Sequence, residues 1–160
     1  MRTLRLLLPL ALVTPAFVAS PAEASPSSFL ADMKAEEVQP VPGPPGAKGK
    51  ARVVADQEAQ TVCYQLTYEG PGQMSAAHIH RGEKGINGPV TINLDVNAEC
   101  VNPNPAEIKA LIDWPDGYYV ELHTVTHQQN GAVRGQTVPE GGSPPPDHQQ
   151  KHQGTTPNCG

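Results

Sequence analysis

The stretch TVCYQLTY, residues 61–68, alternates apolar and polar side chains along its whole length. A period of two is typical of a β-strand that buries one of its faces. The predicted inner face carries Val62, Tyr64, Leu66 and Tyr68. The same alternation recurs on both sides of this stretch, between turn residues, and predicts further strands over residues 50–55, 74–80, 89–96, 118–124 and 132–138.

Two more elements complete the predicted fold. Phe29-Leu30 marks an upstream strand, and a Pro-rich loop separates it from the strand over residues 50–55. Asn104 is a suitable N-cap, Pro105 fits a first helical position and Glu107 follows three residues after the cap, so one short helix is expected there. About seven strands and one helix indicate an all-β domain, built as a small sandwich or barrel. In residues 89–96, the side chains expected to face inward are Val90, Ile92 and Leu94.

The first 24 residues have the three parts of a signal peptide. Arg2 and Arg5 precede an apolar stretch over residues 6–18, and Ala22-Glu23-Ala24 supplies small residues for cleavage, with residues 18–20 as a second possible site. The apolar stretch is shorter than a membrane-spanning helix needs, which makes a retained anchor the weaker alternative. We therefore expect a secreted protein, extracellular or periplasmic, without a stable membrane anchor.

The last part of the chain changes character after Val138. Residues 139–160 contain no apolar residue that could hold them on the domain, and we expect a disordered tail. The predicted domain is therefore residues 25–138. His148 and His152 in the tail are weak metal ligands at most, and a solvated polar segment is the simpler interpretation.

Charge and motif content narrow the function classes. Without Arg2, Arg5 and Glu23 the chain keeps 9 of its 11 basic and 15 of its 16 acidic residues, a net charge of −6. A nucleic-acid-binding protein is expected to have the opposite balance. The chain contains no G-x-S-x-G, no phosphate-binding loop and no H-E-x-x-H. We assign no catalytic residues, and the sequence leans against an enzyme without deciding the question.

All three cysteines lie in the part that would be exported, where disulfides persist. Cys63 falls in a predicted strand and Cys100 in a loop after another strand, which favours a Cys63–Cys100 disulfide. The loop that this pair closes would stabilise the domain by about 4 kcal/mol in the chain-entropy model. Cys159 is then left over, either free, capped, or paired with a second molecule in a dimer.

Three histidines form the most distinctive pattern. His78 and His80 are two residues apart on one predicted strand, so their side chains point the same way. In residues 118–124 the alternation puts His123 on the polar face together with Tyr119 and Glu121. If the two strands are neighbours, three imidazoles converge, an arrangement that holds zinc or copper and leaves a fourth position open for chemistry.

A structural interpretation of the same residues stands beside the metal site. Arg134 is predicted to lie on a neighbouring face, where its positive charge would oppose a bound cation unless a carboxylate pairs with it. Glu121 is the obvious partner. A hydrogen-bonded cluster of histidines, Arg134 and Glu121 that pins the strands together is therefore at least as strong an interpretation as a metal site, and both stay open.

Two sets of motifs occur in order along the chain. The first set is Ala77-His78-Ile79-His80, Gly82, Gly85 and Gly88-Pro89-Val90. The second set is Gly117-Tyr118-Tyr119-Val120, His123-Thr124 and the segment over residues 131–136. Together they resemble the two halves of the CHRD domain, a module named after chordin that also occurs in exported bacterial proteins. The resemblance covers roughly residues 28–138 and suggests a stand-alone, secreted, bacterial-type member.

The resemblance implies a small β-sandwich or barrel similar to immunoglobulin-like folds and to copper–zinc superoxide dismutase. In chordin the repeats belong to a secreted antagonist that binds growth factors. The dismutase copper ligands match only His78 and His80, and the rest of that site has no recognisable counterpart, so superoxide chemistry is not expected. The implied function is a secreted, non-enzymatic binding or structural module with an unknown extracellular or envelope partner. The alternatives are a copper- or zinc-binding protein and a subunit that dimerises through Cys159.

Overall fold

Antiparallel pairing connects all the strands in residues 25–141, the part of the chain that the structure, a computed structural model, describes. Within these residues there is one α-helix, α1 (Pro105–Asp113), and single 3-10 turns cover residues 35–37 and 115–117. The strands are β1 (Ser27–Lys34), β2 (Lys48–Asp56), β3 (Thr61–Glu69), β4 (Met74–Arg81), β5 (Val90–Leu94), β6 (Cys100–Val101), β7 (Tyr118–Thr124), β8 (Val133–Gln136) and β9 (Val138–Pro139).

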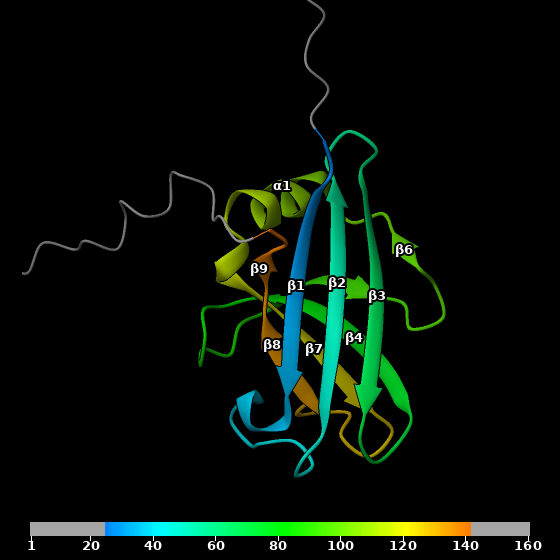
Figure 1. Cartoon of the computed structure of the whole chain (residues 1–160), viewed down its shortest axis with the longest axis vertical. Coiled ribbons are helices and arrows are strands. Elements are labelled where there is room, and N and C mark those ends of the chain that lie inside the picture. Colours follow the sequence, from blue (N-terminus) through cyan, green and yellow to red (C-terminus); the bar gives the residue numbers. More distant parts are fainter. Residues whose placement is uncertain (1–24, 142–160) are drawn as a thin grey trace, which may run out of the picture.

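The strands form one sheet that curls into a nearly closed barrel (Figure 1). Their order is β5-β4-β7-β8-β1-β2-β3-β6, and β9 pairs with β1 beside this path. The segment between β5 and β6 is tied back to β3, because the Tyr64 amide donates to Glu99 O at 2.8 Å and the Tyr64 hydroxyl to Asp95 O at 2.9 Å. These bonds draw the two ends of the sheet together, and the predicted all-β class is confirmed.

One hydrophobic core fills the barrel, and α1 covers one end of it (Figure 1). Ile108 and Leu111 of α1 are fully buried in this core. The helix begins where the sequence predicts, since the Asn104 side chain accepts a hydrogen bond from the Ala106 amide at 2.9 Å. Side chains of the sheet that are fully buried in the core include Val53, Val62, Ile79, Val120 and Leu122.

Two of the predicted strands differ from the structure for local reasons. The strand expected over residues 132–138 is interrupted at Thr137, whose hydroxyl donates to the carbonyl oxygens of Pro115 and Tyr118, and it becomes β8 and β9. Val90 was expected to face inward but is 44% exposed. A shift of register between Ile79 and His80 breaks the alternation of β5 at this point.

Ordered contacts run past Val138, the predicted end of the domain. Pro139 pairs with Phe29, and the Glu140 amide donates to Ser28 O at 2.8 Å. The Glu140 carboxylate also lies 2.7 Å from the Arg52 guanidinium. Residues 139–140 therefore pack on the barrel, whereas the predicted signal peptide and residues 142–160, with His148, His152 and Cys159, lie outside the described residues.

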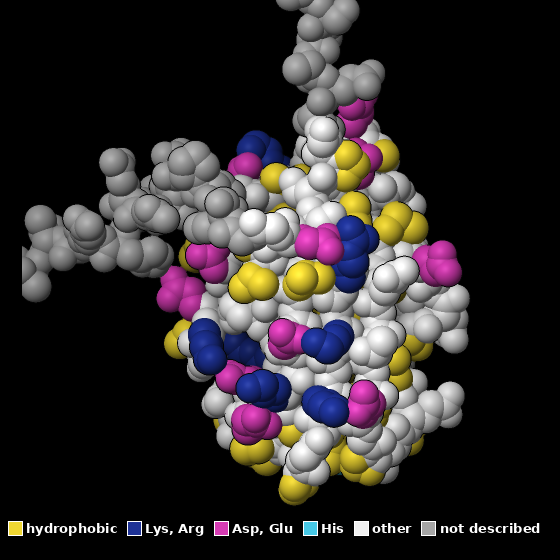
Figure 2. Space-filling view, in the orientation of Figure 1, with side chains coloured by type: hydrophobic (Ala, Val, Ile, Leu, Met, Phe, Trp, Pro, Cys, Tyr) yellow, Lys and Arg dark blue, Asp and Glu magenta, His cyan; other side chains and the backbone are white. Residues whose placement is uncertain are grey.

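The outer face of β1, β2 and β3 carries charges of both signs in alternation (Figure 2). Lys50 lies 2.7 Å from Asp32, and Lys48 lies 3.1 Å from Glu69. Each of these pairs is solvent-exposed and contributes little to stability, but together they leave this face without a patch of single sign. In the described part of the chain no helix is long and apolar enough to cross a membrane.

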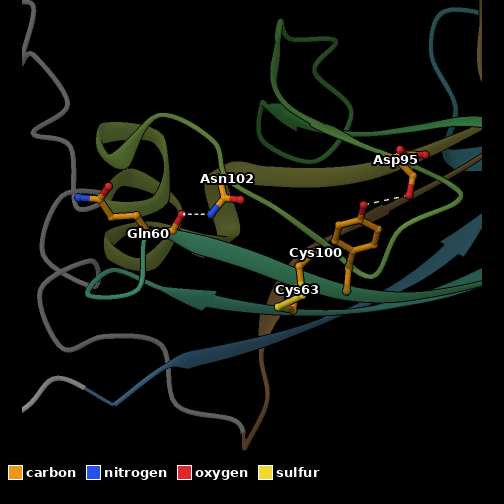
Figure 3. The surroundings of a disulfide bond; sticks show 6 residues. Gln60, Cys63, Asp95, Cys100 and Asn102 are labelled. Atoms are coloured by element: carbon orange, nitrogen blue, oxygen red, sulfur yellow. Dashed lines mark hydrogen bonds between the residues drawn. A yellow bond between two sulfur atoms is a disulfide. The ribbon is translucent and has the colours of Figure 1, made fainter.

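The predicted Cys63–Cys100 disulfide is present in the structure (Figure 3). The two cysteines lie directly opposite each other in the β3–β6 pair. Beside them, Asn102 Nδ2 donates to Gln60 O at 3.2 Å. The disulfide thus adds a covalent link to the hydrogen bonds that hold the short strand β6 on β3.

We predict that the double variant Cys63→Ser/Cys100→Ser lowers the free energy of unfolding by up to about 4 kcal/mol, because the unfolded chain regains the loop freedom that the disulfide removes. Urea unfolding followed by circular dichroism measures this change. Cys159→Ser is the matched control and should unfold like the wild type. A double variant that unfolds within about 0.5 kcal/mol of the wild type would show that the disulfide is not a main source of stability.

Candidate metal centre

The outer face of β4, β7 and β8 carries a row of polar side chains that face away from the barrel core. In the register of these strands, His78 lies opposite Glu121, and Glu121 lies opposite Arg134. His123 follows Glu121 two residues later on β7 and so shares its face. The structure therefore brings together the three predicted histidines from two neighbouring strands, and one ligand atom from each lies within 4.8 Å of the others.

Most of this face is buried, and His78 is half-buried. His80 is 8% exposed, Glu121 4% and His123 7%. Two loops lie over the face: residues 82–89 follow β4, and residues 125–132 follow β7. We call the side chains under these loops the covered cluster, defined as His78, His80, Glu121, His123 and Arg134.

Arg134 holds the first loop in place. Its side chain is 2% exposed, and one terminal nitrogen donates to Ile86 O at 2.7 Å and to Glu83 O at 3.1 Å. The guanidinium carbon lies 3.5 Å from the centroid of the Tyr119 ring, a cation–π contact. Charge-assisted hydrogen bonds to carbonyls are among the stronger polar contacts in proteins, so the loop is clamped by this side chain.

The expected pairing of Arg134 with Glu121 is wrong. The two residues face each other across β7 and β8, yet no ion pair joins them among the described residues. The guanidinium turns toward the loop because the carbonyls of Glu83 and Ile86 and the Tyr119 ring meet it there. Glu121 therefore lacks the ion pair with Arg134 that a purely structural cluster of these residues would contain.

Backbone carbonyls fix the protonation of two histidines. His80 Nδ1 lies 2.9 Å from Gly88 O, and His123 Nδ1 lies 2.9 Å from Gln128 O. A carbonyl oxygen only accepts, so each Nδ1 must carry the proton, and in a neutral ring Nε2 then presents a lone pair. Both Nε2 atoms are buried, and no described protein group donates to either.

His78 and Glu121 add further polar atoms to the same place. The buried Nδ1 of His78 has no hydrogen-bond partner among the described residues, and its ring centroid lies 4.9 Å from that of His123. Glu121 Oε2 lies 3.5 Å from His80 Nε2 and 4.0 Å from His123 Nε2, while Oε1 has no partner. The Nε2 atoms of His80 and His123 thus lie beside a buried carboxyl group and receive no hydrogen bond from the described residues, and Arg134 Nη1 is likewise buried without a partner.

Burial sets the charge state of the cluster. It lowers the pKa of His78 to about 4, with the nearby His123 and His80 as smaller causes, and it also lowers the pKa of His80 and of His123. Burial raises the pKa of Glu121 to about 7, although Arg134 opposes this shift. At neutral pH the three imidazoles are therefore uncharged, which is the form that binds a metal.

The side chain of His127 is not part of the cluster, although its backbone contacts His123. Its Nδ1 contacts the Thr126 hydroxyl at 3.0 Å and the Thr124 hydroxyl at 3.3 Å, within the loop that follows β7. In residues 25–141 the three clustered histidines are the one group of histidine, cysteine or carboxylate side chains placed to hold a metal. The sequence located these three, but it gave no signal for the carbonyls of Gly88 and Gln128, because any residue type supplies a backbone oxygen.

We predict that Arg134→Lys lowers the free energy of unfolding by about 2–3 kcal/mol, because an ammonium group cannot keep both carbonyl contacts and the ring contact. Urea unfolding checks this value. The matched control Arg52→Lys, at an exposed ion pair with Glu140, should change stability little. Equal, small effects of the two substitutions would contradict a clamping role for Arg134.

We predict that the metal-free protein, kept in a chelator, loses stability as the pH falls from 6.5 to 4.5. Because the pKa of each of the three histidines is lower in the folded state than in the unfolded state, the unfolded state binds more protons at these sites as the pH falls. The raised pKa of Glu121 acts the other way by one proton, because the folded state holds that proton up to about pH 7. The net effect is destabilisation on acidification.

Urea unfolding at the two pH values measures this effect, and His78→Gln is the informative variant. Removing the histidine with the pKa of about 4 should make the loss of stability clearly smaller. An unchanged pH dependence in His78→Gln would show that the cluster does not set it.

Comparison with known families confirms the resemblance that the motifs indicate. A family model described as the CHRD domain matches residues 29–137, a span that contains nearly all of the barrel, both covering loops and the three histidines. No curated protein and no solved structure matches the chain. Because the family model covers more than half of the 160 residues, the chain belongs to the CHRD domain family.

Proposed function

We propose that this protein is an exported, non-enzymatic binding protein whose ligand is a copper or zinc ion held by His78, His80 and His123. One observation carries the proposal: the Nδ1 protons of His80 and His123 are held by backbone carbonyls, so that two buried Nε2 lone pairs converge with the third histidine. Histidine ligands of metals commonly donate their second ring nitrogen in this way, which fixes the tautomer and aims the ligand atom.

The chemistry of the cluster favours a cation over a hydrogen-bonded structural cluster. A structural cluster is stable when donors and acceptors alternate, and here His80 Nε2 and His123 Nε2 are both acceptors with no hydrogen-bond donor among the described residues. A buried acceptor without a donor costs about 1–3 kcal/mol. A metal ion satisfies several acceptors at once, and neutral imidazole suits zinc and copper.

Three further features support a site of action outside the cytoplasm. The first 24 residues have the composition of a signal peptide. The Cys63–Cys100 disulfide is of the kind that persists in oxidising compartments. The CHRD domain is a module of exported proteins, as the resemblance of the sequence implies. We propose the periplasm or the extracellular medium as the location, where the cluster would meet external metal ions.

We predict that the protein, expressed from its full-length chain and purified after export, binds about one Cu²⁺ or Zn²⁺ per molecule. Isothermal titration and elemental analysis measure the stoichiometry, and the intact mass shows whether the first 24 residues are gone. His80→Gln should weaken binding by more than about 100-fold, because loss of a ligand exceeds the 10- to 100-fold loss expected for an outer-shell partner.

His127→Gln is the matched control, since it removes a histidine from the covering loop without touching the cluster. This variant should keep the wild-type affinity and stoichiometry. If the wild type binds no metal, or if His80→Gln and His127→Gln bind it equally well, the three-histidine site does not exist as proposed.

A further inference from the structure

Glu121 lies beside His80 and His123 in the covered cluster, and its Oε1 has no hydrogen-bond partner among the described residues. The side chain is 4% exposed and comes from β7, between Tyr119 and His123 on the same face. We infer that Glu121 is the fourth ligand of the metal ion and closes a site of three imidazole nitrogens and one carboxylate oxygen. This inference rests on the proposed function, which assigns only the three histidines.

The distances place the carboxylate where a fourth ligand belongs. Zinc binds nitrogen and carboxylate oxygen at about 2.0–2.2 Å, so neighbouring ligand atoms of a tetrahedral ion are about 3.4 Å apart. Glu121 Oε2 is 3.5 Å from His80 Nε2 and 4.0 Å from His123 Nε2. The oxygen thus stands close to the spacing of neighbouring ligands from two of the three nitrogens. Glu121 is not among the side chains whose ligand atoms all lie within 4.8 Å of one another, so binding as a fourth ligand requires the carboxylate and His78 to move toward the ion.

No lysine or arginine forms an ion pair with this carboxylate among the described residues, although the charge of Arg134 acts on it at longer range. Arg134 is the nearest cation in the strand register, but its hydrogen bonds go to the Ile86 and Glu83 carbonyls. A buried carboxylate without a partner either takes up a proton or stays ionised at a cost in stability. A residue of this kind is expected where its partner is a ligand rather than the protein itself.

A proton is a poorer explanation than a metal ion. A protonated carboxyl group has one O–H and donates one hydrogen bond, so it could satisfy either His80 Nε2 or His123 Nε2 but not both. The unpartnered nitrogen of His78 would remain as well. A four-coordinate cation satisfies all four side chains together.

The backbone next to the carboxylate keeps it in this position. Gly131 has a φ of +80°, and a Cβ atom at that residue would lie 2.5 Å from Glu121 Oε1. The glycine therefore lies directly against the carboxylate on one side, while the two histidines lie on the other. The loop over residues 125–132 thus both fixes His123 through Gln128 O and closes around Glu121.

Four protein ligands change what the site does. A closed tetrahedral site is typical of zinc that is held, whereas a catalytic zinc site keeps one position for water or substrate. We accordingly assign the cluster to the retention of a divalent cation that accepts three nitrogens and one oxygen, under two loops that must open for the ion to enter or leave.

The experiment compares wild type, Glu121→Gln and Glu83→Gln, each loaded with Co²⁺ as a spectroscopic substitute for zinc. The wild type should show the intense visible bands of four-coordinate Co²⁺. In Glu121→Gln the bands should change and the affinity should fall at least about tenfold. Glu83→Gln removes one negative charge from an exposed position on the covering loop and should match the wild type in both respects.

Thermal unfolding provides a second readout that a merely structural carboxylate would not give. Without metal and at pH 8 or above, Glu121→Gln should melt at a higher temperature than the wild type, since a neutral amide replaces a buried carboxylate that has no ion-pair partner. With metal, the order should reverse. If Glu121→Gln melts lower without metal and keeps the wild-type spectrum and affinity, Glu121 is a structural residue and the inference fails.

The two proposals fail in different ways. Absence of Co²⁺, Zn²⁺ and Cu²⁺ binding by the wild type removes the three-histidine site and the fourth ligand with it. Binding by the wild type with the weak visible bands of five- or six-coordinate Co²⁺ keeps the histidine site and overturns the closed four-ligand sphere, even if Glu121→Gln does not fold.

Discussion

Two hydrogen bonds, from His80 Nδ1 to Gly88 O and from His123 Nδ1 to Gln128 O, determine how the outer face of this barrel is built. Each bond joins a strand to the loop that follows it, and so helps to bury a polar face that would otherwise meet solvent. Each also fixes a tautomer, because the carbonyl admits only a protonated nitrogen. The arrangement of ligand atoms and the closure of the loops are therefore consequences of the same two contacts.

The domain separates stability from function across the two faces of one sheet. Ile79, Val120 and Leu122 point into the hydrophobic core, while their neighbours His78, Glu121 and His123 point into the covered cluster. The core and the disulfide stabilise the barrel, and this allows the other face to hold acceptors that lack donors. Unfavourable local contacts of this kind concentrate at functional sites, where a ligand removes the cost.

Much of the fold could be predicted because each strand buries one face, and burial leaves a period of two in the sequence. The pattern in residues 61–68 locates β3 to within one residue, and that of residues 118–124 locates β7. The same period places the three histidines on one face. The sequence does not predict β6, because a strand of two residues cannot show a period. The prediction that Val90 faces inward is wrong because a shift of register interrupts the pairing of its strand.

The burial of the cluster could not be predicted, and neither could the partner of Arg134. Both depend on loops that fold back over the sheet and contact side chains through backbone carbonyls, which carry no residue-specific signal. Opposite charges on neighbouring strands suggested a pair between Arg134 and Glu121. In the structure this pair does not form, because the guanidinium of Arg134 contacts the Tyr119 ring and donates hydrogen bonds to two backbone carbonyls instead. The carboxylate of Glu121 lies next to His80 and His123 instead.

The most direct test of this account is nitrogen-15 NMR of the histidine rings in the metal-free protein at neutral pH. The account predicts that His80 and His123 are neutral, with the proton on Nδ1 and a bare Nε2, and that Nε2 is the nitrogen whose resonance moves when Zn²⁺ is added. Protons on Nε2 in both rings, or charged imidazolium rings, would contradict the central claim that backbone carbonyls aim these lone pairs at one shared point.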